Sequence, residues 1–224
     1  MSWFTKALSG SIGRKLIMAA SGLFLVTFLL EHLIGNLLLL NDDKTVYNGY
    51  AKFMGENIVI SILEYVLFAG FIIHIVFAII ITIQNKKVRP VGYAVSNASE
   101  NSSWFSRNMG LTGLTIFAFL ALHLKTFFLP HKVGIGQKNA ETLWDEAVYT
   151  FSSPVYVGIY VVAMTLLAFH LVHGFQSSFQ TLGARHPKYT PLIKGTGYGF
   201  AIIVPALFAL IPVYMYLHHT LNLF

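Results

Sequence analysis

The chain has 224 residues, of which 55% are hydrophobic and only 11% are charged. A typical soluble domain carries roughly 25% charged residues, so this composition excludes an ordinary soluble enzyme, a disordered chain and a collagen-like fibre. It predicts a protein whose solvent is mostly lipid. The net charge of +6 comes from basic residues between apolar runs. Membrane orientation explains them better than nucleic-acid binding, and we expect no nucleic-acid partner.

Cysteine is absent and histidine occurs nine times. Without cysteine this chain can form no disulfide, thiolate metal site, iron–sulfur cluster or c-type haem attachment.

Five apolar runs are long enough to cross a bilayer, which takes about 20 helical residues. They cover residues 16–40, 58–83, 109–129, 155–179 and 198–217. Because backbone polar groups in lipid must be satisfied internally, each run is predicted to be a helix. The first run is longer than the apolar core of a signal peptide, and we interpret it as a retained helix. We therefore expect an all-α membrane protein with residues 1–224 in one transmembrane domain, joined by loops too short for a second domain.

Lysine and arginine are distributed unevenly between the two sides of the predicted spans. Ten lie on the side of the N-terminus: Lys6, Arg14, Lys15, Lys86, Lys87, Arg89, Arg107, Arg185, Lys188 and Lys194. Five lie on the other side: Lys44, Lys52, Lys125, Lys132 and Lys138. The positive-inside rule then predicts a cytoplasmic N-terminus. We call the N-terminal side the inner side and the opposite side the outer side.

Each of the first four runs contains a histidine, and an ionisable residue inside a membrane helix is a functional candidate by default. These residues are His32, His74, His123 and His170, with His173 one turn beyond His170. His32 and His123 precede the outer ends of their outward-running helices by nine and seven residues. His74 and His170 precede the inner ends of their inward-running helices by ten residues each. The sequence thus predicts an outer and an inner layer, about 10 Å apart at ~1.5 Å per residue.

Two layers of paired histidines on four helices fit two bis-histidine haems held in a four-helix bundle. Small residues on the histidine faces would admit a flat porphyrin, and Gly35, Gly70 and Gly174 lie three or four residues from a histidine. A single membrane histidine is more often a hydrogen-bonded packing residue or part of a proton path. His170 and His173 lie on adjacent faces, so either is a candidate for the fourth ligand.

Each histidine lies in a short segment: Glu31-His32-Leu33-Ile34-Gly35-Asn36, Ile73-His74-Ile75, Leu122-His123-Leu124 and Phe169-His170-Leu171-Val172-His173-Gly174. Two further segments precede them in the chain, Ser11-Ile12-Gly13-Arg14-Lys15-Leu16 and Ser21-Gly22-Leu23. In order and spacing these segments resemble the dihaem cytochrome b subunit of succinate:quinone oxidoreductases. That family provides the single-chain, five-helix membrane anchor of succinate dehydrogenase or fumarate reductase in bacteria that use menaquinone. The resemblance covers nearly the whole chain.

The resemblance implies that His32 and His123 bind the outer b-type haem, and that His74 and His170 bind the inner one. His170 is favoured over His173 because the family's fourth ligand is followed by glycine at the fourth position, here Gly174. It further implies electron relay between an iron–sulfur subunit at the cytoplasmic face and a membrane quinone, most simply menaquinone. A flavoprotein subunit with FAD would hold the succinate site.

The resemblance also implies a multi-pass protein of the bacterial inner membrane, in contact with lipid, in a complex that can dimerise. Some fumarate reductases of this type carry a proton-transferring glutamate two residues before the fourth ligand. That position is Ala168 here, which puts that proton path in doubt.

The quinone and propionate contacts rest on fewer residues. Glu64, in the outer half of the second run, is a candidate for proton exchange with a quinol, and the alternative is a structural pair with a hydroxyl or basic group. Glu31 is a weaker candidate because it points about 100° away from His32. Arg14, Lys15 and Lys125 are cationic candidates for haem propionates.

Two other functions share the same histidines. One is the dihaem subunit of a different quinone-linked enzyme, such as a hydrogenase or formate dehydrogenase. The other is a haem-free, proton-coupled transporter.

Overall fold

The computed structural model describes residues 10–87, 100, 102–133 and 140–223. These residues form helices joined by short turns, with no strand among them. The elements are α2 (Ser11–Asn36), η1 (Leu37–Leu40), α3 (Lys44–Glu56), α4 (Ile58–Lys87), α6 (Trp104–Arg107), α7 (Met109–His123), η2 (Leu124–Phe128), α8 (Leu129–Val133), α9 (Leu143–Phe151), α10 (Pro154–Thr181), α11 (Thr190–Met215) and η3 (Tyr216–Thr220). Lys6, Arg89 and Lys138 of the charge count lie outside the described residues.

Within the described residues, five helical segments are long and apolar enough to span a membrane. They are Ser11–Leu40, Ile58–Lys87, Met109–Lys132, Pro154–Thr181 and Thr190–Thr220. Each contains one of the predicted runs, so the prediction of an all-helical protein with five potential spans is confirmed. The last segment begins eight residues earlier than its apolar run. Pro191 accounts for this, because proline in the first turn suits a helix start that hydropathy does not mark.

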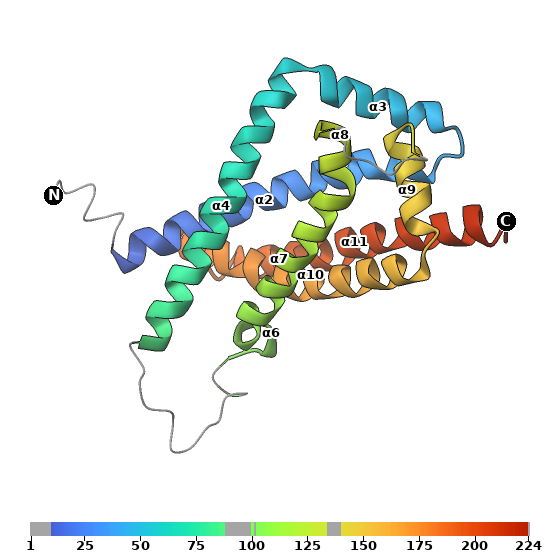
Figure 1. Ribbon diagram of the computed structural model, residues 1–224. Helices are drawn as coiled ribbons and strands as arrows, with labels where there is room; N and C mark the ends of the chain where they lie inside the picture. Colours follow the sequence, from blue (N-terminus) through green and yellow to red (C-terminus); the bar gives the residue numbers. More distant parts are fainter. Residues whose placement is uncertain (1–9, 88–99, 101, 134–139, 224) are drawn as a thin grey trace.

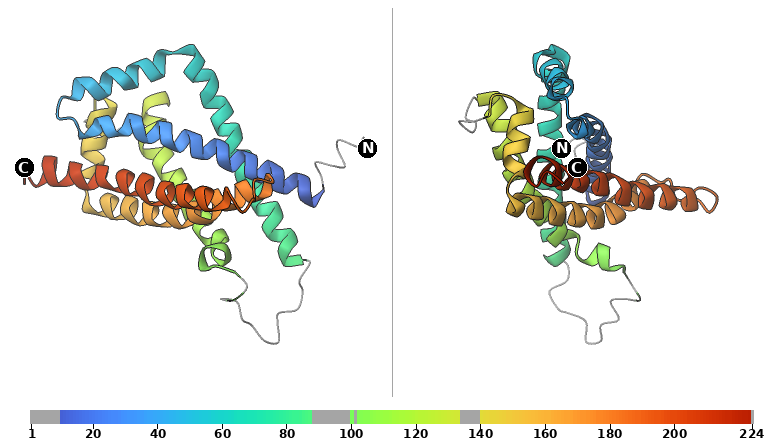
Figure 2. Two further views of the ribbon diagram at one scale, coloured as in Figure 1. Left: turned by 180° about the vertical axis from the view of Figure 1, so that it is seen from behind. Right: turned by 90° about the vertical axis from the view of Figure 1, so that its right-hand side faces the viewer.

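The long helices run in two directions (Figure 1). Helices α2, α10 and α11 lie along one direction, and α4 and α7 cross them at a steep angle. From behind, α10 and α11 lie side by side along their length, and this is the most extensive helix contact (Figure 2). Helix α10 also packs against α2 and α7, while α4 packs mainly against α2. The steep crossing brings residues near the middle of each helix together.

The ends of the helices separate into two groups (Figure 1). The start of α2, the end of α4, the start of α7 and the connection between α10 and α11 lie toward the lower left. Helices α3, α8, α9 and the C-terminal end lie toward the upper right. This alternation is what a chain that crosses a membrane with each long helix produces. The fold thus separates the segments that the sequence analysis assigns to the inner and outer sides.

Two of the connections on the outer side are helical, whereas the sequence analysis expects plain loops there. Helix α3 is capped by Asp43, whose carboxylate accepts hydrogen bonds from the Thr45 amide and hydroxyl. These bonds lower the pKa of Asp43. Helix α9 starts with a capping box between Thr142 and Asp145. Such caps satisfy amide groups that a short helix would otherwise leave unpaired.

A cluster of buried apolar side chains lies near the outer end, where η1, α9, α10 and α11 meet. Leu39, Ala147, Phe151, Tyr160, Ile211 and Met215 form this cluster. Helix α4, by contrast, turns large apolar side chains outward, including Ile62, Val66 and Ile72. An exposed apolar face of this length suits a helix surrounded by lipid.

Candidate functional site

His32 on α2 and His123 on α7 meet in the outer half of the molecule. Their ring centroids are 5.8 Å apart and their planes are nearly perpendicular, at 88°. Aromatic rings from three helices surround them. Phe28 stacks on His32, Phe119 stacks on His123, and Phe208 of α11 lies 5.7 Å from His32. This outer pair is therefore a packed, largely aromatic site.

His74 on α4 and His170 on α10 form a second contact toward the inner side. Their ring centroids are 6.4 Å apart at an interplanar angle of 67°. The ring that faces His74 from α10 is thus that of His170, while His173 is half-buried one turn further along. The fold brings the histidines together in the two pairs that their depths along the helices predict.

Hydroxyl groups from neighbouring helices hold three of the four rings. Ser21 Oγ on α2 lies 3.2 Å from His74 Nδ1, Thr112 Oγ1 on α7 lies 3.5 Å from His170 Nδ1, and Tyr160 Oη on α10 lies 3.0 Å from His123 Nδ1. A further polar contact comes from within α2, where the Asn36 amide lies 3.3 Å from His32 Nδ1.

The hydroxyl contacts of the inner pair favour one tautomer. Ser21 already donates its proton to the Met18 carbonyl, and Thr112 donates to the Met109 carbonyl. Each hydroxyl oxygen is then an acceptor for an Nδ1–H of His74 or His170. Nε2 keeps its lone pair in that tautomer, and this is the form in which a histidine binds a metal.

Helices α2 and α7 carry these groups at matching positions. Ser21 stands eleven residues before His32, and Thr112 stands eleven residues before His123. Eleven residues are close to three helical turns, so each hydroxyl lies on the same face as its own helix's histidine but about 16 Å away along the axis. One face of each helix thus contributes a histidine to the outer pair and a hydroxyl to the inner pair.

The donor set fits metal ligation. A metal ion shared by two imidazoles holds their centroids roughly 6 Å apart, because each metal–nitrogen bond is about 2.0–2.1 Å long. The centroid separations of 5.8 Å and 6.4 Å are in this range. Neutral imidazoles fixed through Nδ1 are also the ligands that b-type haem iron takes.

The glycines that contact the imidazole rings differ from those singled out in the sequence. A Cβ atom on Gly22 would lie 3.4 Å from Cε1 of His74, and one on Gly113 would lie 3.6 Å from Cε1 of His170. Gly35, Gly70 and Gly174 instead face Tyr50, Phe24 and Met109. A role for these three in lining a cofactor stays a prediction.

The two acidic residues of the spans both have partners. Glu64 Oε2 lies 2.8 Å from Nζ of Lys132, and both side chains are about one-quarter to one-third exposed, at 25% and 31%. Glu31 accepts a hydrogen bond of 3.1 Å from the Tyr50 hydroxyl. Burial, together with the charge and hydrogen bond of Glu31, raises the pKa of Tyr50 to about 12. The structural alternative for Glu64, a pair with a basic group, is therefore present, and proton exchange with a quinol stays a prediction.

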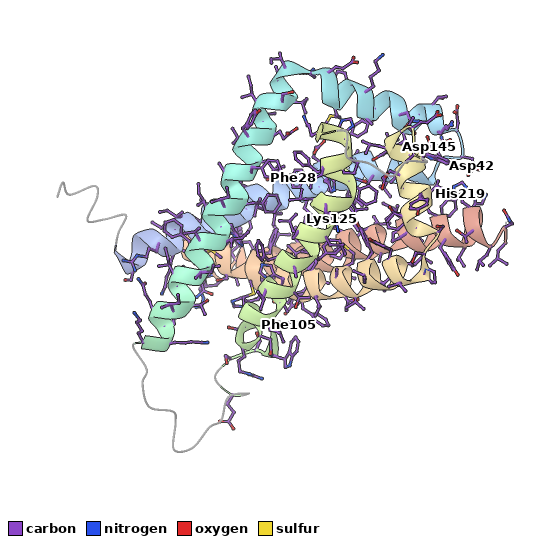
Figure 3. All side chains as sticks on the ribbon, viewed as in Figure 1. Phe28, Asp42, Phe105, Lys125, Asp145 and His219 are labelled. Carbon is purple, nitrogen blue, oxygen red and sulfur yellow. The ribbon has the colours of Figure 1, made fainter. Side chains whose placement is uncertain are left out.

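Two of the predicted propionate partners lie at the start of α2, and the third lies close to His123 in the sequence. Arg14 is half-buried and Lys15 is exposed near the start of α2, on the inner side. Lys125 is exposed on η2, two residues after His123 (Figure 3). Their role as propionate partners stays a prediction.

The contacts of the Ser21, Thr112 and Tyr160 hydroxyls with the histidines were not predicted from the sequence. One signal was available, because Ser21 and Thr112 each stand eleven residues before a histidine of the outer pair, on the same helix face. Which helix a side chain faces depends on the crossing angle and the rotation of the helices, and the hydropathy pattern contains no information on either.

Comparison of the chain with protein-family models, curated protein sequences and solved structures finds no match.

Proposed function

We propose that this chain is a dihaem cytochrome b that anchors a succinate:quinone oxidoreductase in the bacterial inner membrane. It relays electrons between an iron–sulfur subunit on the inner side and a membrane quinone, most simply menaquinone. The observation that carries the proposal is the meeting of four histidines from four helices in two pairs, 5.8 Å and 6.4 Å between centroids.

In this proposal His32 and His123 hold the outer haem, and His74 and His170 hold the inner one. Bound haem iron supplies one-electron redox chemistry, with a potential that its axial ligands and their hydrogen bonds adjust. Ser21 and Thr112 orient the inner ligands by accepting from Nδ1, and the Tyr160 hydroxyl lies 3.0 Å from Nδ1 of His123. Phe28, Phe119 and Phe208 would surround a group bound at the outer pair with apolar aromatic rings.

The chain leaves the remaining chemistry to partners. It contains no cysteine for iron–sulfur clusters, so those clusters belong to another subunit. The resemblance assigns the flavin to a separate flavoprotein subunit. Arg185 and Lys188 are exposed on the inner side, and the proposal assigns them to docking such a subunit by complementary charge. The same residues also serve as topology determinants.

On the outer side, Glu64 and Lys132 form the titratable pair that the proposal assigns to the quinone. Their separation of 2.8 Å allows the carboxylate to be held in place by the ammonium group. A carboxyl group at this depth can take up or release the proton that accompanies quinone redox chemistry.

The test is a dithionite-reduced minus air-oxidised spectrum of the purified complex, with haem counted per chain. The proposal expects b-type bands, two haems per chain and reduction by succinate. Copurification with a nickel or molybdenum subunit would instead favour a hydrogenase or formate dehydrogenase. A chain that folds and shows no reducible haem would contradict the proposal and favour the haem-free transporter.

A further inference from the structure

A cluster of metal-ligating side chains lies at the outer end, apart from the four intramembrane histidines. It consists of Asp42, in the turn between η1 and α3, and His218 and His219 of η3. One ring nitrogen from each histidine and one carboxylate oxygen all lie within 4.8 Å of one another. Figure 3 shows Asp42 and His219 together at this end, beside the C-terminal end of the chain. Residues about 176 positions apart in the sequence thus converge here.

The distances within the cluster suit a tetrahedral metal ion. Zinc bonds to histidine and carboxylate are about 2.0–2.2 Å long, which places neighbouring donor atoms roughly 3.3–3.6 Å apart. Asp42 Oδ1 and His218 Nδ1 are separated by 3.6 Å. The third donor needs to approach by only about 1 Å to complete the set.

The state of His219 is the second observation. Its Nε2 atom is buried and has no hydrogen-bond partner among the described residues. A buried polar atom without a partner carries an energetic penalty, which an ion bound to that nitrogen would remove. The ring is held edge-to-face by Trp144 of α9, with centroids 5.1 Å apart, so it has a defined position.

The other two ligands are also positioned by neighbours. Tyr214 stacks on His218 with an interplanar angle of 7° and a centroid distance of 5.3 Å. Its hydroxyl donates to Asp42 Oδ1 at 3.4 Å. Contacts of this kind orient metal ligands in known sites. The histidines also lie in a π-helical turn, a local irregularity that is frequent at functional sites.

We propose that Asp42, His218 and His219 form a binding site for a divalent transition-metal ion of the zinc class. Two imidazoles and one carboxylate are a donor set that zinc accepts, and they leave a fourth position for water. The ion links η3 to the turn before α3 and so fastens the C-terminal end of the chain to the outer side of the bundle. This site does not depend on haem binding at the four intramembrane histidines.

The test uses the full chain in detergent, purified without a polyhistidine tag and stripped with a chelator. Co²⁺ is added as a spectroscopic probe, and Zn²⁺ is used to displace it. We expect one equivalent of Co²⁺ with visible ligand-field bands, lost on adding Zn²⁺, and a rise in Tm with Zn²⁺. His219→Ala and Asp42→Asn should each weaken Zn²⁺ binding at least tenfold and remove the rise in Tm.

Two controls separate this site from other histidines. His186→Ala, at an exposed position on the inner side, should leave Zn²⁺ binding unchanged. His123→Leu tests the intramembrane pair and should also leave it unchanged, whether or not the chain binds haem. Equal Zn²⁺ affinity in His219→Ala and His186→Ala would overturn the proposal, as would the absence of stoichiometric binding. In that case the cluster contains only the ion pair between His218 and Asp42 and does not bind a metal ion.

Discussion

The hydroxyl of Ser21 on α2 lies 3.2 Å from Nδ1 of His74 on α4. This contact joins two helices that cross steeply, and a similar one joins Thr112 on α7 to His170 on α10 at 3.5 Å. Both hydroxyls occur eleven residues before a histidine of the outer pair. Helices α2 and α7 therefore each contribute to both layers, with a histidine in the outer one and a hydroxyl in the inner one.

Ser21→Ala and Thr112→Val should loosen the inner haem and leave the outer haem in place. Each change removes the acceptor of an Nδ1–H, and loss of such an orienting partner lowers metal affinity about 10–100-fold in known sites. The measurement is the rate of haem loss to an acceptor such as apomyoglobin, together with the midpoint potential of each haem.

The matched controls are Thr27→Ala on α2 and Thr115→Val on α7. Among the described residues, the hydrogen bonds of these hydroxyls go to carbonyls of their own helix, those of Leu23 and Leu111. These variants should retain both haems with unaltered potentials. If they lose haem as fast as Ser21→Ala does, the hydroxyl contacts have no orienting role.

His123→Leu and His74→Leu should each halve the haem content and affect different haems. The pairs lie in separate layers, so removing one ligand leaves the other pair complete. Redox titration of each variant should show one remaining midpoint potential, and the two variants should retain different ones. Retention of the same haem in both would contradict the pairing of His32 with His123 and of His74 with His170.

The Glu64–Lys132 pair should contribute measurably to stability. Its 2.8 Å separation and partial burial place it between exposed pairs and fully buried ones. We expect a coupling of about 1–2 kcal/mol, which lies between the values typical of the two classes. A double-mutant cycle with Glu64→Gln and Lys132→Met measures it by unfolding in detergent. Additive effects of the two single changes would show that the pair is not coupled.

The same variants test the proton-exchange role of Glu64. If the carboxyl takes part in quinone chemistry, Glu64→Gln should lower quinone reduction further than Lys132→Met does, at equal haem content. Equal losses of quinone reduction in the two variants would indicate that the Glu64–Lys132 pair has only a structural role.

Gly35→Ala should destabilise the packing of α3 on α2. A Cβ atom at this position would lie 2.6 Å from Cε1 of Tyr50, so the tyrosine must move and release Glu31. Overpacking of this kind costs about 1–3 kcal/mol. Gly49→Ala on α3 is the control, because a Cβ atom there meets nothing within 4 Å, and it should stabilise by up to about 1 kcal/mol. Thermal unfolding in detergent compares the stability of the two variants. A Gly35→Ala variant as stable as the wild type would contradict the contact between Gly35 and Tyr50.

Hydropathy and spacing predicted the features that belong to single helices. The five spans followed from run length, and the grouping of His32 with His123 and of His74 with His170 followed from depth. These predictions agree with the structure because the rise per residue along a helix is nearly constant. Each span among the first four also holds few ionisable residues, so the histidines stand out.

Features that depend on how helices cross were not predictable in the same way. Gly22 and Gly113 face imidazole rings on other helices, whereas Gly35, Gly70 and Gly174, which share a face with a histidine, meet other side chains. Helices α3 and α9 were missed because their caps at Asp43 and Thr142 are short polar patterns that also occur in loops. The cluster of Asp42 with His218 and His219 joins distant segments, and no local pattern in the sequence signals it.

The central claim is that two histidine pairs hold two haems, and one measurement tests it most directly. Haem is quantified as the pyridine haemochrome in the purified wild-type chain and in His123→Leu, alongside circular dichroism to show that both are folded. The account predicts two b-type haems per wild-type chain and one in the variant. A folded wild-type chain without b-type haem, or a variant that keeps both haems, would contradict it.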